Sequence, residues 1–178
     1  MSTRQPGVRF TGDSAAAPGA IYDLLADLRS HISWAGEMQS SDFRLMSLDA
    51  PPGAAVKGTR FDSTGAIPMS GLRWHDESVV TEATRAAVFE FVTDAHAGPT
   101  TARYRHRYEI SPSGSSSRVT YTMTQESIER PMWRLGLPVV RTMSWRFAIP
   151  MYAGRGFHNL LAAATARARS SAPAEARA

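Results

Sequence analysis

The segment 101–110 alternates more strictly than any other part of the sequence. The residues of one parity are mainly aromatic: Tyr104, His106, Tyr108 and Ile110. The other parity carries three arginines and a glutamate. Because successive side chains of a β-strand point to opposite faces of a sheet, this pattern predicts a strand with one covered face and one face in water.

A second alternating run, residues 118–125, follows a turn that we predict at 111–117 from its serines, its proline and its glycine. One parity of this run holds Val119, Tyr121, Met123 and Gln125. If the two strands pair, the aromatic and hydrogen-bonding side chains of both lie on one face. Further strands are predicted at 7–13, 43–47, 57–67, 72–81 and 87–94.

Helical periodicity precedes and follows this run of strands. Apolar residues from Ile21 to Leu28 predict an amphipathic helix that begins near Pro18. A short helical piece is predicted at 31–38. From residue 131 to about 168 the pattern is again helical, and Pro138 and Pro150 are expected to end or kink the helix. An apolar stripe follows this last segment: Met132, Leu135, Val139, Met143 and Phe147.

Strands in sequence with helices at the ends are typical of an α+β domain rather than a parallel α/β sheet. A chain of 178 residues has the size of one domain. We predict a single domain over residues 6–168, with a curved antiparallel sheet under a long C-terminal helix and a cavity between the two layers. Residues 169–178 are predicted to form a disordered polar tail.

The composition argues against several kinds of site. The sequence has no cysteine, which excludes disulfides, thiolate metal ligands and cysteine nucleophiles. The five histidines lack metal-ligand spacing, and no nucleotide-binding fingerprint or serine nucleophile elbow is present. We therefore expect no metal and no cofactor. No stretch has the pattern of a signal peptide or a membrane span, so we expect a cytoplasmic protein.

Four segments, in this order of elements, resemble the START-like SRPBCC superfamily, and more narrowly the bacterial polyketide cyclase/dehydrase and lipid-transport group. They are Ile21-Tyr-Asp-Leu-Leu-Ala-Asp-Leu28, Gly58-Thr-Arg-Phe61, residues 79–91 and Asn159-Leu-Leu161. The resemblance implies the helix-grip fold, in which an antiparallel sheet wraps around the C-terminal helix and an apolar cavity. It also implies that the protein binds a small apolar molecule, and only some members of the group catalyse a reaction.

The covered face of the two alternating strands is the predicted binding surface. Its candidate ligand-binding residues are Tyr104, His106, Tyr108, Tyr121 and Met123, with Trp34, Phe61, Trp74 and Phe91 as walls or a lid. Phenol and imidazole groups among apolar residues suit a flat or hydroxylated ligand. Ordinary core packing, in which each hydroxyl is satisfied by a neighbour, is the alternative.

Four charged groups of the central strands, Arg60, His75, Asp76 and Glu77, are the ones closest to the predicted cavity. Catalytic members of the resembled group are thought to use such groups for enolisation or dehydration of a poly-β-ketone. The alternative, which we favour, is that they face solvent or form cross-strand ion pairs. We assign no catalytic residue on sequence grounds.

The C-terminal third carries the positive charge, because residues 130–178 hold eight arginines and one glutamate. One predicted helix face collects Arg134, Pro138, Arg141, Trp145 and Tyr152. Such a face could make weak contact with an anionic membrane surface, but a solvated face with Arg141 stacked on Trp145 is the reading we prefer. Residues 131–153 could form a lid, a dimer surface or a membrane-contacting helix, so both monomer and homodimer remain open.

The sequence therefore predicts a protein that binds or transports a small hydrophobic, lipid-like or polyketide-like ligand. An aromatase/cyclase or dehydratase acting on polyketide-like substrates is the first alternative. A membrane-surface or partner-binding module is the second. Nucleic acid is not an expected partner, because the positive charge is sparse and the aromatic face is predicted to lie under a helix.

Overall fold

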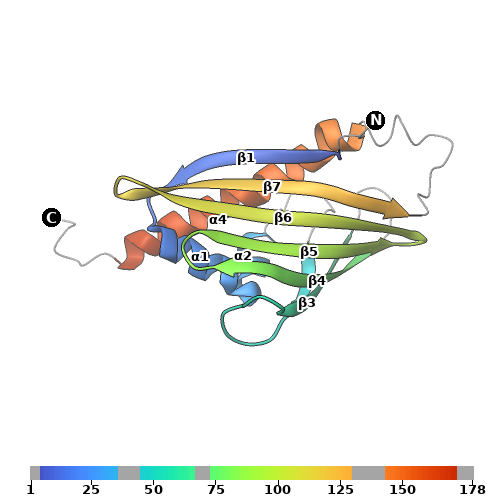
Figure 1. Cartoon of the computed structure of the whole chain (residues 1–178), viewed down its shortest axis with the longest axis horizontal. Coiled ribbons are helices and arrows are strands. Elements are labelled where there is room, and N and C mark those ends of the chain that lie inside the picture. The colour runs from blue at the N-terminus through green and yellow to red at the C-terminus, as the bar shows by residue number, and fades with distance from the viewer. Residues whose placement is uncertain (1–4, 36–44, 67–72, 130–142, 172–178) are drawn as a thin grey trace.

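The computed structural model describes residues 5–35, 45–66, 73–129 and 143–171. In this part of the chain the strands form one antiparallel sheet in the order β1-β7-β6-β5-β4-β3-β2 (Figure 1). The strands are β1 (Gly7–Ser14), β2 (Leu45–Asp49), β3 (Arg60–Ala66), β4 (Arg73–Thr84), β5 (Val88–Ala97), β6 (Thr100–Ser113) and β7 (Ser116–Glu129). The predicted run of antiparallel strands is confirmed.

The described helices lie on one face of the sheet, which we call the inner face (Figure 1). They are α1 (Pro18–Ala26), α2 (His31–Trp34) and α4 (Ile149–Ser171). A 3₁₀ turn, Leu28–Ser30, joins the first two, and a π-helical turn, Ser144–Ala148, precedes α4. The α4 helix runs obliquely behind the sheet and packs mainly on β1. The predicted α+β architecture is therefore present.

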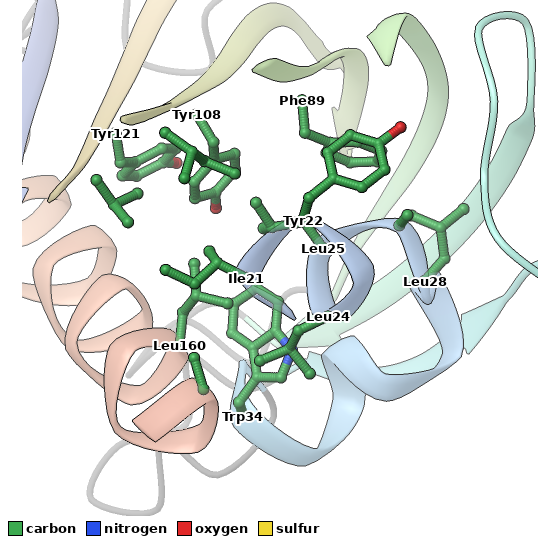
Figure 2. Close-up of a cluster of buried hydrophobic side chains, with 14 of the residues drawn as sticks. Ile21, Tyr22, Leu24, Leu25, Leu28, Trp34, Phe89, Tyr108, Tyr121 and Leu160 are labelled. Carbon is green, nitrogen blue, oxygen red and sulfur yellow. The ribbon is translucent and has the colours of Figure 1, made fainter. Parts of the chain in front are cut away.

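The α1 helix forms where the sequence predicts it, with Pro18 in its first turn, where the backbone amide has no helical partner. Its apolar side is buried, and Ile21 and Leu25 have no exposed surface. Tyr22 meets Phe89 of β5 edge to face, with ring centroids 6.1 Å apart (Figure 2). These contacts fix α1 against the centre of the sheet.

The hydrophobic core lies between α1, α4 and the part of the sheet near the β6–β7 turn. Phe157 and Leu160 of α4 are buried in it, as are Val119 and Phe89 of the sheet. Gly12 of β1 allows the close approach of α4, because a Cβ atom there would lie 2.6 Å from Cδ1 of Leu161. This half of the inner face is a closed, well-packed core.

The turn between β6 and β7 is shorter than the predicted turn at 111–117. Strand pairing continues to the Ser113 and Ser116 pair, so only two residues form the turn. Gly114 adopts a φ of +61°, the left-handed conformation that tight hairpins require. Local propensity overestimated the loop because cross-strand pairing keeps the flanking serines in the ladder.

The C-terminal helix follows the prediction in part. Pro150, which lacks a backbone N–H, lies in the first turn of α4, directly after the π-helical turn. Of the predicted apolar stripe, Met143 and Phe147 are exposed, and the other three residues lie outside the described part of the chain. The helix extends to Ser171, beyond the predicted start of the polar tail at 169, and residues 172–178 are outside the described residues.

The outer face of the sheet carries a ladder of ion pairs centred on Glu90. Its side chain is only 8% exposed and accepts hydrogen bonds from Thr81, Arg105 and Arg107, the last with an N–O distance of 2.8 Å. Burial raises the pKa of Glu90, but the hydrogen bonds from Arg107, Thr81 and Arg105 outweigh it, so the pKa lies below its ordinary value. The ladder holds β4, β5 and β6 together.

We expect Glu90→Gln to lower the free energy of unfolding by about 2 kcal/mol at neutral pH, because hydrogen bonds to a buried charge are lost. Since the folded-state pKa is lowered, this contribution is present above the unfolded value of about 4.5 and is lost as the pH falls through the folded value. Urea unfolding at neutral and acidic pH measures it. The matched control is Glu109→Gln, whose exposed carboxylate pairs only with Arg107 and should change stability by less than about 0.5 kcal/mol. Equal effects of the two variants would contradict this account.

Candidate functional site

The inner face of the sheet changes character along its strands. Near the β6–β7 turn it presents large, fully covered side chains such as Tyr108 and Tyr121. Toward the β5–β6 turn the inner positions of four adjacent strands carry mostly small side chains, together with Trp74, Asp76 and Tyr104. We call the small residues the floor: Ser63 and Gly65 of β3, Ser78 of β4, Thr93 and Ala95 of β5, and Ala102 of β6.

Cross-strand pairing brings parts of the floor together, with Asp76 between Ser63 and Ala95 and with Trp74 opposite Gly65. Ser78 is opposite Thr93, and their hydroxyl oxygens lie 2.9 Å apart, which satisfies both groups. Ala95 is opposite Ala102 in the next pair of strands. Small side chains at adjacent positions leave room above a sheet that larger side chains would fill. The floor is therefore a candidate surface for contact with another molecule, and its residues other than Ala95 are buried.

Three polar side chains, Asp76, Tyr104 and Gln125, stand around the floor, and we call them the polar rim. The amide nitrogen of Gln125 donates to the hydroxyl oxygen of Tyr104 at 3.4 Å. Gln125 is only 4% exposed, yet its Oε1 atom is buried and has no hydrogen-bond partner among the described residues. A buried acceptor without a partner costs about 1–3 kcal/mol, so this atom is a candidate contact for a bound group.

Asp76 is the carboxyl group of the polar rim. It lies opposite Ser63 of β3 and Ala95 of β5. Burial raises its pKa to about 7, and no side chain in the described segments pairs with it. Burial also raises the pKa of Tyr104, against a lowering by the Gln125 hydrogen bond, and the nearby Asp76 carboxylate raises it further. Asp76 and Tyr104 therefore interact electrostatically across β5.

A row of stacked rings separates the polar rim from the closed core. The rings of Phe91 and His106 are nearly parallel with centroids 4.6 Å apart, and Phe61 meets Phe91 at 5.4 Å. His106 Nδ1 and the Tyr121 hydroxyl oxygen are 2.8 Å apart, within hydrogen-bond distance. Burial lowers the pKa of His106 to about 4, so the ring is neutral at physiological pH. The row offers a flat apolar wall beside the floor.

The neutral state of His106 predicts a loss of stability in mild acid. The pKa of His106 is lower in the folded state than its unfolded value of 6.5. The contribution of neutral His106 to the free energy of unfolding is therefore fully present above pH 6.5 and falls as the pH drops from 6.5 toward 4. Between pH 7 and pH 5 the loss is about 2 kcal/mol. Comparing urea unfolding of the wild type with His106→Phe isolates this group, because buried His31 titrates in both proteins. The stability difference should shift by that amount in favour of the variant at pH 5, and an unchanged difference would refute the assignment.

The structure brings the predicted ligand-binding residues together on the inner face, except for Trp34. The residues on this face are Phe61, Trp74, Phe91, Tyr104, His106, Tyr108, Tyr121 and Met123. Trp34 lies in α2 and contacts His31 with ring centroids 4.6 Å apart and the ring planes tilted by 53°. Figure 2 shows its indole on the helix side of the core, away from Tyr108 and Tyr121.

The charged residues of the central strands divide between the two faces. Asp76 faces inward, whereas Arg60, His75 and Glu77 are exposed on the outer face, where His75 and Glu77 lie 3.8 Å apart. The interpretation that these groups face solvent therefore holds for Arg60, His75 and Glu77, but not for Asp76. The sequence analysis missed Gln125 and the floor as site residues. Gln125 shares its parity with Tyr121 and Met123, which is the signal that could have identified it.

The described residues contain no cluster of three or more side chains that could hold a metal ion. Among the helices of the described segments, none is both long and apolar enough to cross a membrane. The predicted arginine-rich helix face lies partly outside the described residues, at Arg134, Pro138 and Arg141. Trp145, which belongs to that face, is half-buried and meets Tyr104 of the polar rim with ring centroids 6.4 Å apart.

Several solved structures have a similar fold. The Zhui aromatase/cyclase from Streptomyces sp. R1128 superposes with a TM-score of 0.70 at 12% sequence identity, and the match covers 93% of this chain and 96% of that one. TTHA0849 from Thermus thermophilus gives 0.62 at 20% identity, covering 94% and 100%. A conserved protein from Geobacillus kaustophilus gives 0.63 at 11% identity, covering 89% and 93%. No family model and no curated protein matches the sequence.

These likenesses concern the fold, because the sequence identities are low. Together with the seven-stranded antiparallel sheet and the long α4 helix, they confirm the expected helix-grip fold. The function must be argued from the side chains of the inner face.

Proposed function

We propose that the protein binds a small, flat, largely apolar molecule over the floor, with the polar group of that molecule at the polar rim. The observation that carries the proposal is the buried Oε1 atom of Gln125, which has no hydrogen-bond partner among the described residues, near a patch of mostly small side chains. Ligand sites in proteins are typically apolar with a few polar groups that fix orientation. The floor, the stacked rings and the polar rim supply these parts.

The two halves of the inner face have different roles in this proposal. The half near the β6–β7 turn is filled by its own side chains and by α1 and α4, so it stabilises the fold. The half with the floor places Phe91 and His106 beside Asp76, Tyr104 and Gln125. The likeness in fold to an aromatase/cyclase also supports an organic ligand at this face.

Native mass spectrometry of the purified protein, followed by denaturation, tests the proposal directly. We expect a co-purified organic molecule at one per chain, or an unoccupied protein that binds the neutral probe naphthalenemethanol with one-to-one stoichiometry in calorimetry. The probe combines a flat apolar ring system with one hydroxyl group. A protein that carries no molecule and binds no probe would overturn the proposal.

A second candidate function is acid-base catalysis of the aromatase/cyclase or dehydratase type. Asp76 favours it, because a carboxyl group with a pKa of about 7 can both donate and accept a proton near neutral pH. Tyr104, on the far side of the floor, would orient a substrate carbonyl. Incubation with a poly-β-ketone analogue should give a cyclised or dehydrated product with the wild type and at least a tenfold slower reaction with Asp76→Asn. Unchanged turnover in that variant would exclude the role of Asp76.

A further inference from the structure

The polar rim presents hydrogen-bond acceptors rather than cations. Gln125 Oε1 is a buried acceptor without a partner in the described part of the chain, and the Asp76 carboxylate is a second acceptor on the same face. The arginines of β6, which is separated from Asp76 by β5, do not pair with Asp76, because they lie on the outer face. There Arg103 pairs with Asp94, and Arg105 pairs with Glu90.

Aromatic rings complete these surroundings. Trp74 precedes Asp76 by two residues in β4 and therefore projects on the same face of the sheet. Tyr104 is close enough to Asp76 for the two groups to interact electrostatically. Trp145 contacts Tyr104 from the helix side. The faces of indole and phenol rings carry partial negative charge and attract cations. The ring faces of Trp74 and Tyr104 thus favour a cation near the Asp76 carboxylate, while the Trp74 indole N–H and the Tyr104 hydroxyl are themselves hydrogen-bond donors.

We propose that the polar group of the ligand is a protonated amine, which pairs with the Asp76 carboxylate. This inference rests on the proposed binding function and narrows its ligand class to flat apolar amines. A carboxylate in an apolar setting is costly unless a cation accompanies it, and an ammonium group supplies both the charge and several N–H donors. A ligand hydroxyl would satisfy one acceptor but leave the carboxylate without a counter-ion, and an anionic ligand would be repelled.

Two probes of nearly equal shape test the inference: naphthylmethylamine, which is protonated at about pH 8, and neutral naphthalenemethanol. Calorimetric titration of the wild type should give at least roughly tenfold tighter binding of the amine, as expected for a desolvated charge pair. Asp76→Asn should remove that preference, because the amide that replaces the carboxylate carries no charge. Glu77→Gln, the adjacent carboxylate on the outer face, is the matched control and should keep the preference.

The outcomes separate this inference from the proposed function. Equal affinity of the wild type for both probes would overturn the amine assignment and leave the binding function in place. A preference that persists in Asp76→Asn, with an unchanged melting temperature, would overturn the role of Asp76. Failure of the wild type to bind either probe would overturn the binding function itself. The wild-type comparison stands on its own, so the inference can fail even where Asp76→Asn does not fold.

Discussion

Replacing Phe89 with alanine is expected to lower the free energy of unfolding by about 3–5 kcal/mol. The Phe89 side chain has no exposed surface and lies where α1 meets the centre of the sheet. Its ring contacts Tyr22 at 6.1 Å and Phe91 at 6.3 Å between centroids, so its loss removes the contact that connects helix and sheet. The cavity left between two packed layers would collapse only partly. Urea unfolding followed by tryptophan fluorescence measures the change.

Phe147→Ala is the matched control for this prediction. The Phe147 side chain is 61% exposed in the π-helical turn, so its removal should change stability by less than about 0.5 kcal/mol. A loss below about 1 kcal/mol for Phe89→Ala would contradict the placement of the core between α1 and β5.

Filling the floor with Ala95→Phe is expected to weaken binding of naphthalenemethanol by roughly a hundredfold, because the new ring would occupy the space proposed for the probe. The same substitution tests whether that space exists. An added ring in a filled core costs about 1–3 kcal/mol through strain, whereas a ring entering open space should cost less than about 1 kcal/mol. Calorimetry gives the affinity and urea unfolding gives the stability.

His96→Phe provides the control on the same strand. His96 stacks on His75 on the outer face, so a ring there should leave probe binding unchanged. If Ala95→Phe binds the probe as tightly as the wild type does, the probe does not lie over the floor. If Ala95→Phe destabilises the protein by more than about 2 kcal/mol, the floor is already covered and the site is wrongly placed.

Much of the fold follows from patterns that are local in the sequence. Strict alternation identified β6 and β7, and the spacing from Ile21 to Leu28 identified α1. The extent of the β6–β7 hairpin did not follow, because serine and glycine favour a loop locally while cross-strand pairing extends the strands to Ser113 and Ser116. The π-helical turn before α4 has no sequence signature beyond the position of Pro150.

The candidate site was harder to predict because it depends on register. Ser63, Ser78 and Ala95 come from three strands, and each is an ordinary small residue by itself. Only the antiparallel pairing brings them to one region of the inner face, where Asp76 lies between Ser63 and Ala95. The alternation of residues alone could not show which face of the sheet carries Asp76, because both faces of β4 carry charged residues in this segment. The burial of alternate residues of β4 shows that Asp76 lies on the inner face. This burial arises only when the sheet folds, so the sequence does not reveal it.

The aromatic candidates separate for the same reason. Tyr108 and Tyr121 have the alternation of binding residues, but α4 covers them, and their rings stack at 4.5 Å within the closed core. Tyr104, further along the same face of β6, stands at the polar rim. Helix placement over the sheet makes the difference, and it depends on contacts far apart in sequence, such as Gly12 with Leu161.

The most direct test of the binding site is methyl NMR of protein labelled at its alanine methyl groups, titrated with naphthalenemethanol. We predict that the methyl resonances of Ala95 and Ala102, which belong to the floor, shift on binding. Those of Ala16 and Ala164, which are buried in the closed core, should stay in place. Shifts confined to Ala16 and Ala164, or no shift at Ala95 and Ala102 at saturation, would contradict the proposed site.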